Sequence, residues 1–213
     1  MLDKWTAPLI QPPLKILASW LQHRGVKPDQ ITIFGFLVGM VAIPLLAFEQ
    51  YSFALFAILI NRCLDGLDGT LARLSAPSDA GGFLDITLDF IFYSGIVMGF
   101  ALAAPDKNAV AASILIFSFM GTGASFLAYA IMAEKHQLSD PHFNHKSLYY
   151  LGGLAEGTET IFLFILFCML PSYFPQLALG FAAVCILTAG LRIWAGYQSI
   201  RQAEREKHNR SAA

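Results

Sequence analysis

Four aspartates, Asp65, Asp68, Asp85 and Asp89, are the residues of this sequence best suited to chemistry. They lie within otherwise apolar stretches, in the segment NRCLDGLDGTLARLSAPSDAGGFLDITLDF of residues 61–90. A carboxylate in the hydrocarbon region of a membrane costs about 2.5–3.5 kcal/mol on insertion scales, and four of one sign also repel one another. A divalent cation offsets this repulsion, and carboxylate oxygens suit Mg²⁺ or Mn²⁺. The four acids therefore predict a metal site that can hold a phosphate-containing ligand.

Helical spacing places these acids on two faces, each beside small residues. The residues that share the first face are Asn61, Asp65, Asp68, Gly69 and Ala72, and those that share the second are Gly81, Asp85 and Asp89. Steps of three, four and seven residues bring side chains to one side of a helix. The glycines let a ligand approach the backbone closely.

The composition indicates the elements that position these faces. Of 213 residues, 56% are hydrophobic and 14% are charged, against about 25% charged in a soluble domain. We expect an all-α integral membrane protein with six transmembrane helices, because six apolar runs approach the roughly 20 residues that a spanning helix needs. The runs cover residues 29–48, 50–72, 82–104, 109–132, 148–170 and 176–199.

Three regions are expected along the chain. Residues 1–27 form an N-terminal amphipathic helix that lies in the membrane interface, with Pro12 and Pro13 at its start. Residues 28–200 form the six-span domain, and residues 201–213 form a charged tail. A cleavable signal peptide is not expected, because the first apolar run follows a polar, proline-containing stretch.

The distribution of charge predicts the orientation. Thirteen of the fourteen Lys and Arg residues flank one set of helix ends, whereas the short connections near 49–52, 105–108 and 171–175 contain only Lys107. Because cytoplasmic loops are enriched in Lys and Arg, both termini and the four aspartates are predicted to face the cytoplasm. A net charge of −1 and the absence of basic–aromatic stripes argue against nucleic acid as a partner.

The pattern D65-G-L-D68-G69-T-L-A72-R73, followed by G81-G-F-L-D85-I-T-L-D89, resembles the motif of the CDP-alcohol phosphotransferase family. Every fixed residue of that motif is present. The gap between Arg73 and Gly81 is one residue shorter than in the motif as usually written. The missing residue falls in the loop LSAPSDA, so both helical registers stay intact. The stretch K27-P28-D-Q-I-T32 is also similar to the family.

The resemblance implies transfer of a substituted phosphate from a CDP-linked donor to an alcohol, with release of CMP. It implies that Asp65, Asp68, Asp85 and Asp89 bind metal and that Asp89 is the catalytic base. It further implies that eight residues, among them Asp65 and Asp68, contact the CDP group. That set is Asp65, Asp68, Gly69, Ala72, Arg73, Gly81, Asn61 and Thr32. Arg73 either contacts the donor phosphate or anchors the helix end.

The acceptor is expected to bind along the same mouth of the protein. Lys146 and Arg192 are candidates for an anionic acceptor, and Glu156 and Glu159 for a cationic head group. Each candidate also has a structural alternative. Lys146 would be an anchor at the membrane interface, Arg192 a packed residue, and Glu156 and Glu159 would take part in structural pairing. The three histidines of loop 134–146 lack the spacing of a zinc site and predict a solvated loop.

Several interpretations of the function remain open at this point. A chain of this size is similar to compact bacterial phospholipid synthases, which favours CDP-diacylglycerol as donor, a small polar alcohol as acceptor and the bacterial inner membrane as location. The first alternative is transfer from CDP-choline or CDP-ethanolamine to diacylglycerol. The second, from a different class, is a divalent-cation transporter. Members of the family often form dimers, so a homodimer is a further expectation.

Overall fold

The chain folds into long helices that run side by side, with one helix lying across them. The computed structural model describes residues 3–136 and 157–212, and within these ranges every regular element is a helix. The elements are α1 (Asp3–His23), α2 (Pro28–Met40), α3 (Ala42–Ala47), α4 (Tyr51–Ser75), α5 (Asp79–Ala103), α6 (Pro105–Lys135), α8 (Gly157–Met169), the short 3₁₀ helix η1 (Pro171–Tyr173) and α9 (Phe174–Ala212).

Four segments are long and apolar enough to cross a membrane: Pro28–Ala47, Asp79–Ala103, Pro105–Lys135 and Pro171–Arg205. Helix α8 is apolar, but its described part has only 13 residues. Helix α4 has 25 residues, which corresponds to about 37 Å at 1.5 Å per residue. Its charged motif residues lower its apolar character, and the count of six spans therefore stays a prediction.

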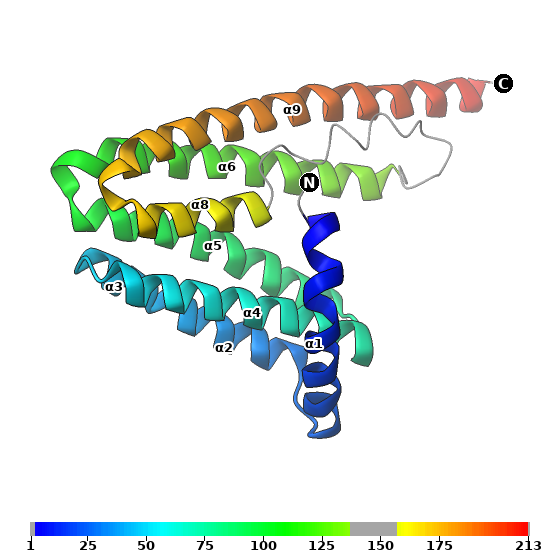
Figure 1. The fold of residues 1–213 in the computed structure, drawn as a ribbon. Helices are drawn as coiled ribbons and strands as arrows, with labels where there is room; N and C mark the ends of the chain where they lie inside the picture. Colours follow the sequence, from blue (N-terminus) through cyan, green and yellow to red (C-terminus); the bar gives the residue numbers. More distant parts are fainter. Residues whose placement is uncertain (1–2, 137–156, 213) are drawn as a thin grey trace.

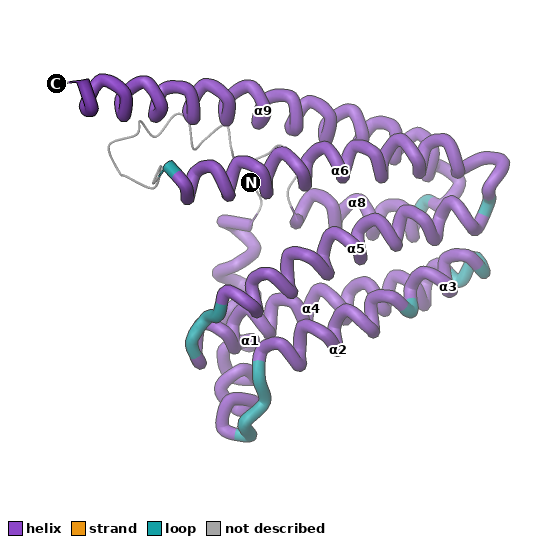
Figure 2. The backbone as a smooth tube through the Cα atoms, turned by 180° about the vertical axis from the view of Figure 1, so that it is seen from behind, coloured by secondary structure: helices purple, strands orange, loops and turns teal. Residues whose placement is uncertain are grey.

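The connections gather at two opposite ends of the bundle. The turns that join α3 to α4, α5 to α6 and α8 to α9 lie at one end, on the left in Figure 1. The α1–α2 and α4–α5 turns and the C-terminus lie at the other end, and Figure 2 shows the same arrangement from behind. The motif segments of α4 and α5 therefore meet at the end opposite to the three short connections.

Two predicted boundaries were wrong, and the first span contains a break that was not predicted. The first span is interrupted at Val41, which separates α2 from α3, because Pro44 has no N–H to donate to the carbonyl of Met40. Residues 105–108 are the first turn of α6 rather than a loop, since proline fits the first position of a helix. Pro12 and Pro13 do not start the N-terminal helix, because α1 already begins at Asp3.

Helix α1 crosses the bundle beside the motif half of α4 (Figure 1). Ala18 of α1 is fully buried against Leu67 and Leu71 of α4, and the Gln22 side chain donates a hydrogen bond of 2.9 Å to the carbonyl oxygen of Leu74. This contact provides a partner for one of the last carbonyls of α4, which have none within the helix. α1 thus braces the end of α4 that carries the aspartates. Its interfacial location remains a prediction.

The core lies among α3, α4, α5, α6, α8 and α9 and is rich in phenylalanine. Phe100 stacks on Phe174 with ring centroids 4.8 Å apart, and Phe167 meets Phe174 edge-on at 4.7 Å. All three side chains are fully buried. Aromatic pairs at these distances add about 0.5–1.5 kcal/mol each beyond burial alone. This cluster fixes α5 against α8 and α9 and so sets the position of the acids near the start of α5.

Candidate active site

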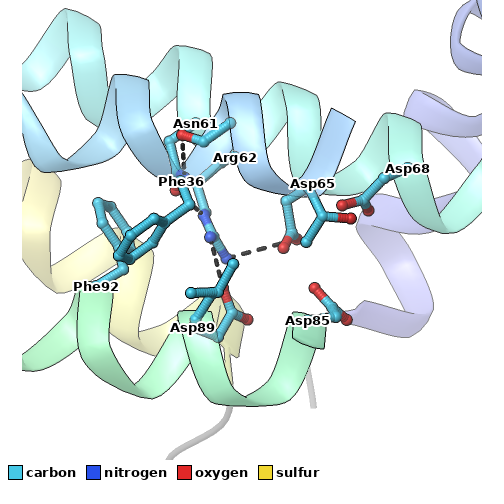
Figure 3. A pocket seen from close by; sticks show the side chains of 11 residues that line it. Phe36, Asn61, Arg62, Asp65, Asp68, Asp85, Asp89 and Phe92 are labelled. Carbon is cyan, nitrogen blue, oxygen red and sulfur yellow. Dashed lines mark hydrogen bonds and ion pairs between the residues drawn. The ribbon is translucent and has the colours of Figure 1, made fainter. Parts of the chain in front are cut away.

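Three of the four aspartates meet between α4 and α5. One carboxylate oxygen from each of Asp65, Asp68 and Asp85 lies within 4.8 Å of the other two. Figure 3 shows these side chains turned toward one another across the gap between the helices. The predicted convergence of the two acidic faces is therefore found for these three residues.

This arrangement fits a divalent cation. Asp68 is only 5% exposed, and its Oδ2 atom is buried without a hydrogen-bond partner in the described part of the chain. A buried carboxylate oxygen normally has a partner, and the oxygens of Asp65 and Asp85 lie close enough to share an ion with it. Oxygen donors of this kind are the ligands that Mg²⁺ and Mn²⁺ prefer. Asp65, Asp68 and Asp85 are the residues that would hold the ion.

Asp89 makes different contacts. Its Oδ1 accepts a hydrogen bond of 2.7 Å from Nη2 of Arg62, and its Oδ2 accepts one of 3.2 Å from the hydroxyl of Tyr93. Arg62 also forms an ion pair of 3.5 Å with Asp65. Asp89 is thus held by an arginine of α4 and a tyrosine of its own helix, beside the group of three carboxylates rather than within it.

A cleft of about 320 Å³ opens on the other side of the carboxylates, and we call it the outer cleft. Its lining includes Thr32 of α2, Asp68, Gly69 and Ala72 of α4, and Gly81 and Asp85 of α5. A side chain at Gly81 would place its Cβ 3.0 Å from Oδ1 of Asp29, so that any larger residue would crowd the α2 side of the cleft. The small motif residues therefore keep this space open.

Two residues predicted to contact the CDP group make hydrogen bonds within the protein. The buried Asn61 donates a 2.9 Å hydrogen bond to the carbonyl oxygen of Gly35 in α2 and accepts one of 2.8 Å from Nε of Arg62. The guanidinium of Arg73 donates to the hydroxyl of Thr70 at 3.0 Å. Asn61 therefore joins α4 to α2 and positions Arg62, and its predicted contact with a nucleotide remains untested.

The candidate acceptor residues are placed only in part. Lys146 and Glu156 lie outside the described residues. Glu159 is in the first turn of α8, and Gly157 in the same turn would place a Cβ 3.6 Å from the Tyr93 hydroxyl. Arg192 is 8% exposed, and its Nη1 donates a 2.9 Å hydrogen bond to the carbonyl oxygen of Thr122, which ties α9 to α6.

Arg62 and Tyr93 are site residues whose roles the sequence reasoning missed. Neither residue was among those predicted for the site. A signal was present for both: Arg62 stands three residues before Asp65 and Tyr93 four residues after Asp89, and both spacings bring side chains to one helical face.

Comparison with known proteins identifies the family. The family model described as CDP-alcohol phosphatidyltransferase matches residues 26–194. The chain belongs to this family. It is a transferase, and its membrane-length apolar helices make it a multi-pass membrane protein. The family is divalent-metal dependent, and Asp65, Asp68 and Asp85 form a cluster that could hold such an ion. The cation-transporter interpretation loses its support.

Relatives extend this comparison. The inner membrane protein YnjF of Escherichia coli is 50% identical over 97% of this chain and 100% of its own length. The archaetidylinositol phosphate synthase of Pyrococcus horikoshii is 34% identical over 53% of this chain and 61% of its own length. The structure of Mycobacterium tuberculosis phosphatidylinositol phosphate synthase with CDP-DAG bound is similar, with a TM-score of 0.55, 19% identity and coverage of 89% of this chain and 92% of that chain. This last likeness concerns the fold.

Proposed function

We propose that the protein transfers a phosphatidyl group from CDP-diacylglycerol to a small polar alcohol, with release of CMP, in phospholipid synthesis. The observation that carries this proposal is the meeting of Asp65, Asp68 and Asp85 beside the outer cleft. A diphosphate in the cleft would lie next to the metal ligands, and the remaining space is lined by small motif residues that leave room for a nucleotide.

The chain would bind the donor as follows. Gly69, Ala72 and Gly81 would accept the cytidine and its phosphates close to the backbone, and Thr32 would border them from α2. A divalent ion held by Asp65, Asp68 and Asp85 would supply charge neutralisation for the diphosphate. Asp68 is buried, and its Oδ2 has no hydrogen-bond partner among the described residues, so we expect it to bind the ion most strongly of the three ligands.

Asp89 would act on the acceptor. An acceptor hydroxyl attacks the phosphorus that carries the diacylglycerol, its proton passes to a carboxylate oxygen of Asp89, and the bond from that phosphorus to the CMP oxygen breaks. Such transfers depend mainly on positioning and on electrostatic stabilisation. Arg62 and Tyr93 hold the Asp89 carboxylate through hydrogen bonds of 2.7 and 3.2 Å. These bonds would fix the direction from which Asp89 receives the proton of the acceptor hydroxyl.

The acceptor would approach from the side of α8. The close approach of Gly157 to the Tyr93 hydroxyl places the start of α8 beside Asp89, and Glu159 lies in the same turn. Two relatives carry the names archaetidylinositol phosphate synthase and phosphatidylinositol phosphate synthase. These names support a phosphorylated polyol as the first acceptor to examine.

The orientation in the membrane belongs to the same proposal. The motif ends of α4 and α5 lie opposite the three short connections (Figure 1), and most basic residues flank the motif end. By the positive-inside tendency, the site and both termini would face the cytoplasm. The relative YnjF is named an inner membrane protein, which supports the bacterial inner membrane as the location.

The test is an assay of CMP release by the purified protein. Labelled CDP-diacylglycerol is incubated with Mg²⁺ and, separately, with inositol phosphate, glycerol 3-phosphate, serine, choline or ethanolamine; CDP-choline and CDP-ethanolamine are tested with diacylglycerol. We expect CMP and a phospholipid product from CDP-diacylglycerol with one of the alcohols. Asp68→Asn should abolish this release, and Asp79→Asn, which changes an exposed aspartate at the start of α5, should retain it. CMP formation only with CDP-choline or CDP-ethanolamine would contradict the proposal.

A further inference from the structure

Arg62 lies outside the fixed positions of the motif, yet it contacts two of the four aspartates. Its Nη2 lies 2.7 Å from Oδ1 of Asp89 on α5, and its Nη1 lies 3.5 Å from Oδ2 of Asp65 on α4. Figure 3 shows the guanidinium between these two carboxylates. Arg62 therefore supplies a positive charge between Oδ2 of Asp65 and Oδ1 of Asp89.

Further contacts fix the guanidinium in this place. Nε donates a 2.8 Å hydrogen bond to Oδ1 of Asn61, and Nη1 donates one of 3.2 Å to the Tyr93 hydroxyl. Its central carbon lies 5.0 Å from the ring centroid of Phe92 and 5.5 Å from that of Tyr93, within the range of a cation–π interaction. The Arg62 side chain is only 15% exposed. It is thus held far more firmly than an arginine at the protein surface.

These contacts divide the four carboxylates into two groups. Asp65, Asp68 and Asp85 bring one oxygen each within 4.8 Å of the others, and Oδ2 of Asp68 has no hydrogen-bond partner within the described ranges, so it is available to a cation. Both oxygens of Asp89, by contrast, already accept hydrogen bonds. A divalent ion on Asp89 would need to approach to about 2.1 Å, which would place it against the positively charged guanidinium.

We propose that Arg62 serves as a fixed cation for Asp89, so that the protein binds a single divalent ion per chain, at Asp65, Asp68 and Asp85, and Asp89 is not a metal ligand. The inference rests on the proposed function, because it concerns the metal ion that this function uses. It replaces the four-ligand site expected from the sequence by three ligands and one ion-paired carboxylate. Arg62 is then a positioning residue that aims Asp89 at the acceptor.

The experiment counts bound Mn²⁺ in the absence of nucleotide, by electron paramagnetic resonance of the unbound ion during titration of the purified protein. We expect one Mn²⁺ per chain in the wild type and in Asp89→Asn. Asp68→Asn should weaken binding at least tenfold. Arg62→Met should bind two ions per chain, because the space between Asp65 and Asp89 then lacks its cation, and Arg62→Lys, which keeps the charge, should bind one.

Arg73→Met is the matched control, since Arg73 belongs to the same helix but donates to Thr70 and not to an aspartate; it should bind one ion. Two ions per chain in the wild type, loss of the ion in Asp89→Asn, or a single ion in folded Arg62→Met would each overturn the inference. If Arg62→Met does not fold, the number of ions bound by the wild type and by Asp89→Asn still tests whether Asp89 is a metal ligand. CMP release is measured on the same samples: two ions with CMP release would refute this inference alone, and one ion without CMP release would refute the proposed function alone.

Discussion

Adding one methyl group at Gly39 should disturb the active site from a distance. A Cβ at this position of α2 would lie 2.8 Å from a ring carbon of Phe92 and 2.9 Å from both Cγ and Nδ2 of Asn61. Both neighbours are buried. Asn61 also holds the carbonyl oxygen of Gly35 and the Nε atom of Arg62. In Gly39→Ala, therefore, the two side chains that must move are ones that support Arg62.

The expected cost combines three contributions. Overpacking of a tight interior costs about 1–3 kcal/mol, and weakening the Asn61 hydrogen bond between helices adds about 0.6 kcal/mol. Replacing glycine by alanine within a helix stabilises the fold by about 0.5–1 kcal/mol. The net loss of folding free energy is then about 1–3 kcal/mol, which corresponds to a fall in melting temperature of roughly 2–12 °C for a chain of this size.

The assay is thermal unfolding in a fixed detergent, followed by CMP release at a temperature where both proteins are folded. Gly190→Ala is the matched control, because a Cβ at Gly190 in α9 meets nothing within 4 Å; its melting temperature should stay level or rise. Gly39→Ala should also turn over more slowly at saturating donor, since Arg62 and Asp89 lose their alignment. An unchanged melting temperature in Gly39→Ala would refute the packing argument.

Four further predictions follow from the site. Asp89→Asn should lower the rate of CMP release by about 10²–10⁴-fold, as expected for loss of a general base; a loss below tenfold would contradict that role. Tyr93→Phe, which removes the 3.2 Å hydrogen bond to Asp89, should cost about 1 kcal/mol, a fall of roughly fivefold in kcat with little change in the donor KM; an effect on KM alone would argue against it. Ala76→Gly should raise the melting temperature, because Ala76 has a φ of 144°, where a residue other than glycine costs of order 1–3 kcal/mol; a lower melting temperature would show that the backbone is not strained there. Removal of divalent ions by a chelator should abolish CMP release and Mg²⁺ should restore it, whereas activity that survives chelation would remove the basis of the metal site.

The sequence was sufficient to predict helical segments and the meeting of three of the four aspartates that it assigned to the site. Apolar runs of sufficient length allow few structures other than helices in a membrane, and a spacing of three or four residues places acids on one helical face. Because α4 and α5 are joined by a short turn, their acidic faces must meet near that turn. The same reasoning did not predict the break at Val41, although Pro44 was visible as its cause.

Polar residues were harder to assign, because a helical face does not reveal what lies opposite. Asn61 shares a face with the metal ligands, and the sequence placed it in the nucleotide site. In the structure its amide reaches the carbonyl oxygen of Gly35, since Gly35 and Gly39 allow α2 and α4 to approach closely. This depends on how α2 packs against α4, which the sequence alone does not disclose.

Arg62 shows the same limit and explains why Asp89 differs from its neighbours. Counted as a charge, Arg62 can offset any one of four acids, and its sequence position three residues before Asp65 favours that residue. The shorter contact is instead with Asp89 across the helix interface, 2.7 Å against 3.5 Å, because Asn61, Phe92 and Tyr93 hold the guanidinium on the α5 side. Because Arg62 pairs with Asp89, we infer that the other three carboxylates, Asp65, Asp68 and Asp85, are the ones that would bind the metal. The placement of Arg62 therefore separates the residues that would hold the donor from the residue that would act on the acceptor.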